Sequence, residues 1–400
     1  MTQLHDRPDG PDHHQAAEPR PPGRVALVLA TSTGGTGAHV ADLARRLAAG
    51  GTAVTVCGPA ATDQQFRFAA APGQVGFVPV EISAGARLSD ARAVTVLRRA
   101  LAPAPPDVVH AHGLRAGLVA ALAVRSVGGR PPLVVTLHNA VLTSGLRGGA
   151  ARAVERLVVR SADLVLCASD DLVDRVRSLG ADRARLGPVA APVLPPPHRG
   201  RAAVRAELGV PEGRPLILSV GRLHPQKGYD VLVAVAARWR RRDPPPVVVI
   251  AGDGPSYLDL VARISSARAP VTLLGHRRDV PDLLTAADLA VVSSVWEARQ
   301  LFAQEALRAG VPLVTTAVGG VPDLVGGAAV LVPPRDPDAL DAAVRRLLDD
   351  PDEQARLAER GRRRAATWPT PEQTVAGVLA AYRDVSTPRN RRSGKRGDGP

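Results

Sequence analysis

Lysine is scarce in this sequence, and one of the two lysines lies where it could do chemistry. Among 51 lysine and arginine residues only Lys227 and Lys395 are lysine. Lys227 lies in the loop 221–228, GRLHPQKG, directly after an apolar run. A compact ammonium beside the guanidinium fork of Arg222 suits phosphate oxygens. We expect Arg222 and Lys227 to hold a diphosphate. Alternatively, the position of this lysine has no functional meaning and is a matter of chance. The loop is not a P-loop, because the spacing of that motif is missing.

Two glutamates form a second candidate pair. Glu297 precedes an apolar helical run at 302–309, and Glu305 lies inside it. A separation of eight residues is just over two helical turns, so both carboxylates can face one side of a cleft. They could also be ordinary surface glutamates. Against that interpretation, the neighbours of Glu305 are apolar, and an unpaired acid is costly there.

Three histidines follow predicted strands. His110 and His112 come at the end of one apolar run, and His138 comes at the end of the next. A single histidine in such a place is usually a structural hydrogen-bonding group, but three together suggest a site. Zinc is conceivable, although no Cys, Asp or Glu stands beside them at ligand spacing. We therefore expect no metal.

Glycines mark two further loops. Gly34 and Gly35 follow the first apolar run, where backbone N–H groups at a helix start can approach an anion. Gly252 and Gly254 follow another run and allow a tight turn on which a base or ribose could pack. Neither pattern is the dinucleotide fingerprint, and the first could be a simple strand-to-helix turn.

These candidates follow short apolar runs that alternate with helical sequence, and the alternation occurs twice. Such a pattern predicts parallel sheets covered by helices on both faces, with ligands beyond the carboxyl ends of the strands. Strands are expected at 25–30, 54–57, 78–82, 108–110, 133–137 and 164–167, and then at 216–220, 247–251, 271–274, 289–293, 313–315 and 330–332. A helix at 89–101 would begin at Ser89 as its N-cap.

The same pattern divides the chain into segments. A disordered tail at 1–23 precedes a first α/β domain at 24–190. A proline-rich linker at 191–200 leads to a second α/β domain at 201–368. The chain then ends with a helix at 369–385 and a disordered basic tail at 386–400.

Composition narrows the setting of the protein. The net charge is +13, and the excess lies in the first domain and the tail. Anionic lipid, a phosphorylated acceptor or nucleic acid could use it, or it could serve solubility alone. With 2% aromatic residues there are few platforms for stacking bases, so specific nucleic-acid binding is not expected. Two cysteines that end apolar runs, and no apolar leader or 20-residue span, favour a cytoplasmic protein. One helix face carries a basic stripe of Arg152, Arg156 and Arg160. This stripe could bind the anionic inner face of the cell membrane, or it could simply be a solvated helix face.

Taken together, the motifs resemble one enzyme family. The motifs occur in the family's order over residues 24–385: Gly34-Gly35 with His39-Val40, His110-Ala111-His112, the Arg222/Lys227 loop, Gly252-Asp253-Gly254 and the Glu297/Glu305 pair. The chain is similar to the family 4 retaining glycosyltransferases of the GT-B fold, in an actinobacterial-like form. That fold has two Rossmann-like domains facing a central cleft. The Glu-x7-Glu pair with the Arg/Lys loop is the specific part of the resemblance.

The resemblance implies a role for each residue. The second domain would bind a UDP- or GDP-sugar, and the first would bind the acceptor, for example a lipid-linked or cell-envelope glycoconjugate. Arg222 and Lys227 would hold the diphosphate leaving group, so neither a metal nor a cofactor is expected. Glu297 would lie near the donor sugar and Glu305 at the ribose. His112, with His110 and His138 beside it, would lie against the sugar, and Gly34 and Gly35 would close on the phosphates. The last helix would cross back to the first domain.

The sequence departs from this family at one place. Ala298-Arg299-Gln300 stands where the family has Gly-Phe-Gly, whose backbone amides approach the donor sugar. Long polar side chains there suggest an acidic or unusual donor sugar. The same departure keeps open a non-catalytic protein that binds sugar nucleotides. A nucleotide-sugar epimerase is a second alternative, because it has a similar two-domain build.

Overall fold

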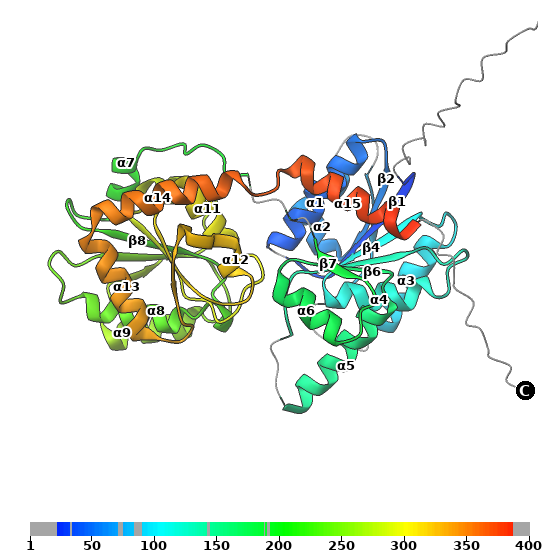
Figure 1. Cartoon of the computed structure of the whole chain (residues 1–400), viewed down its shortest axis with the longest axis horizontal. Helices are drawn as coiled ribbons and strands as arrows, with labels where there is room; N and C mark the ends of the chain where they lie inside the picture. Colours follow the sequence, from blue (N-terminus) through cyan, green and yellow to red (C-terminus); the bar gives the residue numbers. More distant parts are fainter. Residues whose placement is uncertain are drawn as a thin grey trace, which may run out of the picture.

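The structure is a computed structural model that describes residues 22–32, 34–70, 75–83, 90–141, 145–187, 189 and 193–386. These residues form two α/β domains side by side (Figure 1). Within this described part, each domain has one sheet, of seven strands in the first and six in the second, and every pairing is parallel. The predicted repetition of the α/β pattern is confirmed. The predicted tails and much of the proline-rich stretch lie outside the described residues.

The first domain contains strands β1 to β7 and helices α1 to α6. Its strands are β1 Arg24–Leu29, β2 Ala53–Gly58, β3 Val75–Pro79, β4 Val108–His112, β5 Leu133–Leu137, β6 Leu164–Cys167 and β7 Ala184–Leu186. Its helices are α1 Gly35–Ala49, α2 Ala60–Phe66, α3 Asp90–Leu101, α4 Leu114–Val124, α5 Gly145–Ser161 and α6 Asp170–Ser178, with a 3-10 turn η1 Phe68–Ala70.

The second domain contains strands β8 to β13 and helices α7 to α14. Its strands are β8 Leu216–Val220, β9 Val247–Ala251, β10 Val271–Leu273, β11 Leu289–Val292, β12 Leu313–Thr316 and β13 Val330–Val332. Its helices are α7 Arg201–Glu207, α8 Tyr229–Trp239, α9 Tyr257–Ala267, α10 Val280–Ala286, α11 Leu301–Ala309, α12 Val321–Val325, α13 Pro337–Asp349 and α14 Pro351–Ala366, with 3-10 turns η2 Pro225–Lys227 and η3 Gly326–Ala328.

Each sheet has a point at which the strand order reverses. The orders are β3-β2-β1-β4-β5-β6-β7 and β10-β9-β8-β11-β12-β13, so the reversals lie between β1 and β4 and between β8 and β11. The loops that leave neighbouring strands at such a point diverge to opposite faces and leave a crevice where ligands bind. Most of the sequence-predicted site residues lie on these four strands, in the loops that follow them or on the next helix. The exceptions are the second glycine loop, which follows β9, and His138, which follows β5.

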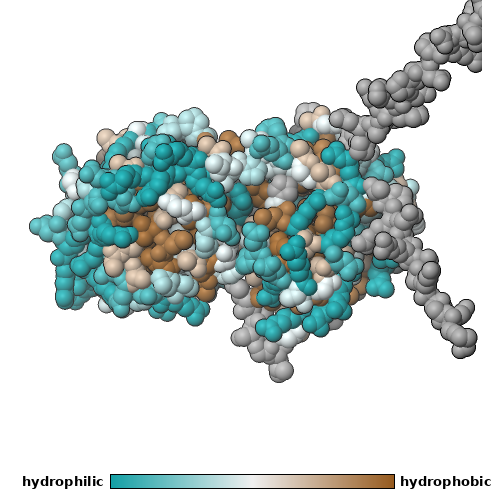
Figure 2. All heavy atoms as spheres, viewed as in Figure 1, coloured by the Kyte–Doolittle hydropathy of each residue, from teal (hydrophilic) through white to brown (hydrophobic). Residues whose placement is uncertain are grey.

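Both sheets are buried on both faces, which explains their aliphatic strands. In β1, Val25, Leu27 and Leu29 pack into one apolar cluster, whereas Ala26 and Val28 pack into another on the opposite face. In the view of Figure 2, hydrophobic residues reach the surface of both domains among hydrophilic ones. Among the described residues no helix is long and apolar enough to cross a membrane. Cys57 and Cys167 are free and buried, and burial raises the pKa of both thiols to about 12.

The last helix, α15 Pro371–Ser386, packs on the first domain although it follows the second. Figure 1 shows it in red beside α1. Its Val378, Ala381 and Tyr382 are buried in the cluster that covers one face of the first sheet. In the first turn of α15, Glu372 accepts a hydrogen bond from Arg46 Nη1 at 2.7 Å. The helix therefore ties the two ends of the described chain to one domain.

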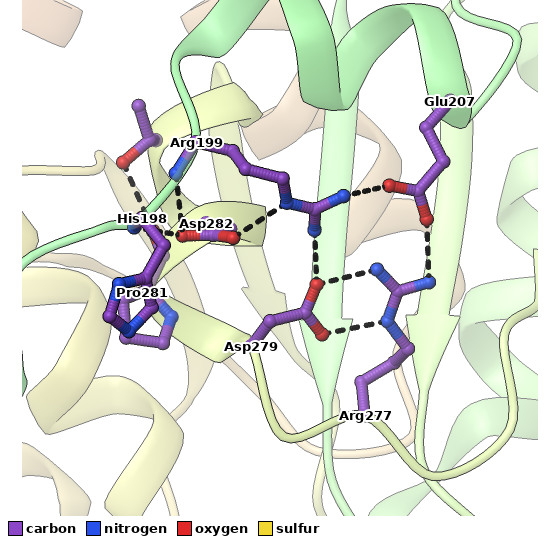
Figure 3. A network of polar contacts seen from close by, with 8 residues as sticks. His198, Arg199, Glu207, Arg277, Asp279, Pro281 and Asp282 are labelled. Carbon is purple, nitrogen blue, oxygen red and sulfur yellow. Dashed lines mark hydrogen bonds and ion pairs between the residues drawn. The ribbon is translucent and has the colours of Figure 1, made fainter.

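A polar network anchors the chain where it enters the second domain (Figure 3). The His198 backbone amide and Arg199 Nε donate to the two oxygens of Asp282, at 2.7 and 2.8 Å. Arg199 also contacts Glu207 and Asp279, and Arg277 bridges the same two acids from the other side. These acids neutralise both arginines and fix residues 198–199 against α10. The Arg199 guanidinium holds the pKa of Asp282 below its usual value.

Three strands differ from the predictions by more than one residue at an end. The strand predicted at 78–82 lies at Val75–Pro79, because its partner β2 ends at Gly58; Val80 and Ile82 are buried beyond the ladder. β4 extends two residues further than predicted, to His112, so His110 and His112 point to the same face. The three-residue edge strand β7 is too short for its pattern to be recognised. The predicted cap Ser89 lies outside the described residues.

Candidate active site

Lys227 and Glu297 form an ion pair at the switch point of the second sheet. Lys227 Nζ donates to Glu297 Oε1 at 2.5 Å, across 70 residues of sequence, and Ser294 Oγ donates to the same oxygen at 2.8 Å. The pair is mostly buried, with side-chain exposures of 18% for the lysine and 9% for the glutamate. Lys227 ends η2 after β8, and Glu297 follows β11, so the adjacency of these two strands brings the charges together.

The backbone around Lys227 is tied to the loop after β11. Ser293 Oγ donates to the Lys227 carbonyl at 3.0 Å, and the Gln226 side chain donates to the Trp296 carbonyl at 2.8 Å. Arg222 differs from Lys227 because it is exposed. No hydrogen bond or ion pair reaches Arg222 from the part of the chain that the structure describes. The loop thus presents one engaged ammonium and one open guanidinium.

Gly252 and Gly254 let the loop after β9 pack against the Arg222 loop. Their φ angles are +151° and +156°, and a Cβ would overlap the carbonyl oxygen of Gly221 or Leu223. The Leu223 amide donates to the Asp253 carbonyl at 2.9 Å, so the two loops are joined. These glycines are needed for that close approach, and any contact with a base or ribose stays a prediction.

Glu305 has a different environment from Glu297. It lies on α11, half-buried, and no hydrogen bond or ion pair reaches its carboxylate from the described residues. Burial raises its pKa to about 7. The two glutamates therefore do not act as a pair in this state: one is neutralised by Lys227, whereas the other is unpaired.

The three residues that replace Gly-Phe-Gly have three different surroundings. Ala298 is 3% exposed and packs into the apolar cluster of the first domain. Gln300 caps α11, where its side-chain oxygen accepts from the Phe302 amide at 2.9 Å. Arg299 is half-buried, and its Nε and Nη2 atoms are buried without a hydrogen-bond partner. The long polar side chain of Gln300 is thus turned to its own helix.

A cluster of histidines lies at the switch point of the first sheet. His112 Nδ1 and His138 Nε2 are 3.3 Å apart, and the rings of His110 and His112 are 4.2 Å apart. His39 from α1 meets both His112 and His138 edge-on, at 5.6 and 5.7 Å. His112 Nε2 is buried and has no partner. The structure therefore brings the three predicted histidines together and leaves one nitrogen of His112 unused.

These histidines are uncharged at neutral pH. Burial is the main cause and lowers the pKa of His110 and His138 to about 3 and of His39 to about 4. The pKa of His112 is also lowered well below its ordinary value, by burial and then by the neighbouring imidazoles. Within the described residues no three His, Cys, Asp or Glu side chains are arranged to hold a metal ion.

Gly34 and Gly35 begin α1 as its cap and its first residue. A Cβ placed on Gly35 would lie 2.5 Å from Leu301 Cδ1, so the start of α1 approaches the start of α11 in the other domain. Other contacts cross the same boundary. Trp296 Nε1 donates to Asp171 Oδ2 at 3.0 Å, and Gly320 lies against Ser169. The predicted residues of the two domains thus face one another.

Sequence reasoning missed several residues of this region. Tyr382 of α15 lies 2.8 Å from His110 Nδ1, which no local pattern could indicate. Ser294 also became part of the site only through its contact with Glu297. Gly319-Gly320 could have been noticed, because a glycine pair follows the strand β12; the Gly320 amide donates to the Glu297 carbonyl at 3.0 Å.

Comparison with known proteins agrees with this architecture. The family described as glycosyl transferases group 1 matches residues 200–364, and a glycosyl transferase 4-like domain matches residues 34–192. D-inositol 3-phosphate glycosyltransferase of Salinispora arenicola is 35% identical over 314 residues, which cover 69% of this chain and 68% of the relative. Glycogen synthase of Mycobacterium tuberculosis is 35% identical, with 72% of each protein covered. The chain belongs to the group 1 glycosyltransferases and is a glycosyltransferase.

Solved structures share the fold. Sucrose-phosphate synthase of Thermosynechococcus elongatus has a TM-score of 0.74 at 21% identity, covering 90% of this chain and 98% of that one. Anabaena HepE in complex with UDP-glucose also has a TM-score of 0.74, at 20% identity, covering 90% of this chain and 99% of that one. At these identities the likeness concerns the fold, which is the GT-B fold that the sequence motifs suggested.

Proposed function

We propose that the protein transfers a sugar from a UDP- or GDP-sugar to an acceptor, with retention of anomeric configuration and without a metal ion. The observation that carries the proposal is the Lys227–Glu297 pair beside the open Arg222 at the switch point of the second domain. A dianionic diphosphate would compete with Glu297 for the ammonium. That exchange would free the carboxylate at the place where a donor sugar follows the phosphates.

In this proposal, cationic side chains stabilise the leaving group. As the glycosidic bond breaks, charge develops on the diphosphate, and Lys227 with Arg222 would neutralise it in a site that excludes water. This is the role that a divalent ion has in other transferases. Glu305 would accept the ribose hydroxyls, and Glu297 would accept hydroxyls of the sugar. HepE, a relative in fold, binds UDP-glucose, which supports a nucleotide-sugar donor.

The first domain would supply the other side of the sugar. His112 is neutral, and its free Nε2 can exchange a hydrogen bond with a sugar hydroxyl without adding charge. Gly34 and Gly35 would approach the phosphates. In retention without an enzyme nucleophile, the acceptor oxygen attacks the face that the diphosphate leaves, and the diphosphate oxygen takes the proton. This route needs no further acid or base.

A combined assay tests this proposal. Purified protein is incubated with UDP- or GDP-sugars, with and without EDTA, and the anomeric configuration of the product is read by NMR. Retention and full activity in EDTA are the expected results. Inversion, or activity that returns only with added metal, contradicts them. Conversion of the donor sugar to its epimer without an acceptor would instead identify an epimerase.

We further propose that the acceptor is presented at an anionic membrane surface. Helix α5 exposes Arg152 and Arg156, with Leu157 41% exposed beside them. This face combines positive charge with an apolar side chain, as in helices that lie on membranes. Flotation with anionic and with neutral liposomes tests the idea. Changing Arg152 and Arg156 to Gln should abolish flotation with anionic vesicles, whereas the matched change of the exposed Arg241 and Arg363 should not.

A further inference from the structure

Arg299 is a half-buried charge without a counter-charge. Its Nε and Nη2 atoms have no hydrogen-bond partner, and no carboxylate in the described part of the chain forms an ion pair with it. Burial, and then the charge of Arg364, lower its pKa to about 10, so the guanidinium is still protonated at neutral pH. A buried unpaired charge is strongly unfavourable unless a partner of opposite charge is supplied.

The neighbourhood of Arg299 adds positive charge. Arg364 of α14 donates from Nε to the Leu324 carbonyl at 3.0 Å and from Nη2 to the Asp323 carbonyl, so α12 holds it in place. Like Arg299, it has no carboxylate partner among the described residues. Other arginines of this domain are either neutralised or open to water. Arg199 and Arg277, for example, share Glu207 and Asp279 (Figure 3), whereas the unpaired Arg222 is exposed. Arg299 differs from both kinds because two of its nitrogens are buried without a partner.

The position of Arg299 connects it to the proposed donor site. It lies two residues after Glu297 and directly before Gln300, which caps α11. Its neighbours Ala298 and Gln300 are 3% and 4% exposed, so the backbone on both sides is fixed. An anion at Arg299 would thus sit beside the loop that carries the Glu297 carboxylate.

We propose that Arg299 binds an oxyanion, a carboxylate or phosphate group that pairs with its guanidinium, and that the positive charge of Arg364 adds to the attraction. A guanidinium presents parallel N–H donors that match the two oxygens of such a group. The anion is either a carboxylate carried by the donor sugar or a free phosphate. The first source rests on the proposed function, because it requires a nucleotide-sugar donor; the second does not.

Binding measurements separate the two sources. Calorimetry compares the affinity for UDP-glucose with that for UDP-glucuronate. If the protein binds GDP-sugars and not UDP-sugars, GDP-mannose and GDP-mannuronate are compared instead. Thermal denaturation follows the response to inorganic phosphate at constant ionic strength. Both use the wild type, Arg299→Gln and Arg364→Gln, with Arg363→Gln as a control that removes an exposed charge from the same helix. Unfolding without ligand checks that each variant is folded.

For a sugar-borne carboxylate we expect the wild type and the control to prefer the uronate at least about tenfold, as for a hydrogen bond to a charged group. Arg299→Gln should lose this preference while keeping its affinity for the neutral donor. For a free anion, phosphate should raise the melting temperature of the wild type and the control but not of Arg299→Gln. The proposal is overturned if the wild type neither prefers the uronate nor responds to phosphate.

Failure of all nucleotide sugars to bind contradicts the proposed function. In that case the denaturation experiment with phosphate still tests the anion site.

Discussion

Trp296 donates a hydrogen bond from Nε1 to Asp171 Oδ2 at 3.0 Å, and this contact joins the two domains directly beside Glu297. Ala298, on the other side of Glu297, is buried in the apolar cluster of the first domain. The glutamate that faces Lys227 is therefore held between two residues that pack on the opposite domain. The position of the first domain and the geometry of the proposed donor site are coupled through this loop.

Removing the Trp296 hydrogen bond should slow transfer more than it weakens donor binding. We expect Trp296→Phe and Asp171→Ala to lower kcat about three- to tenfold, as for the loss of one hydrogen bond, with donor affinity nearly unchanged. Steady-state kinetics and donor calorimetry measure the two effects. Asp170→Ala, at the exposed neighbouring position, is the matched control. Equal losses in kcat and donor affinity would argue against a positioning role.

Lys227 should matter for both transfer and stability. Lys227→Ala should lower kcat/KM by about 10²–10³, as for the loss of one group that stabilises developing charge. It should also destabilise the fold by roughly 3 kcal/mol, because Glu297 stays buried without its partner. Lys227→Arg should be substantially impaired, since a fork replaces a point charge.

A double variant separates the two effects of Lys227. Lys227→Met with Glu297→Gln should regain most of the stability, because no buried charge is left, but none of the activity. Urea denaturation and transfer assays give the two readouts. A double variant as unstable as Lys227→Ala, or Lys227→Ala with full activity, would show that the pair does not have this role.

Glu305 should make stability depend on pH. Its pKa is raised to about 7 in the fold, so the folded state holds a proton that the unfolded chain releases near pH 4.5. Stability from this group is present below pH 4.5 and is lost as the pH rises towards 7. Glu305→Gln should therefore stabilise the protein at pH 8, on the order of 1–2 kcal/mol, with little effect at pH 4. Denaturation at several pH values measures this, and a pH-independent effect would contradict it.

Tyr382 should stabilise the histidine cluster of the first domain, although it lies on α15, which follows the second domain in the sequence. Its hydroxyl lies 2.8 Å from His110 Nδ1, and both groups are buried. Tyr382→Phe leaves that nitrogen unpaired, and we expect a loss of about 1–2 kcal/mol. Tyr257→Phe, in a tyrosine that is 41% exposed, should change nothing. Thermal denaturation of both variants tests the difference, and equal melting temperatures would refute it.

The fold was predictable because its signal is local. Strands such as Leu133–Leu137 and Val247–Ala251 are apolar runs bounded by loop residues, and the structure has them at the predicted bounds. The strand at Val75–Pro79 was misplaced because its position depends on where β2 ends, which the local pattern does not contain. β7 exists only because β6 offers a free edge to pair with.

The sequence alone identified the motifs, the order in which they occur and their residue types, because each motif lies within one loop or strand end. It could not determine which charges are neutralised. Lys227 is paired with Glu297, 70 residues away, because β8 and β11 are neighbours at the switch point of the sheet. Arg299, in the same loop as Glu297, has no partner within the described chain. Two charges of the same sign differ in this way because Coulomb energy depends on distance and burial, and only tertiary structure sets both.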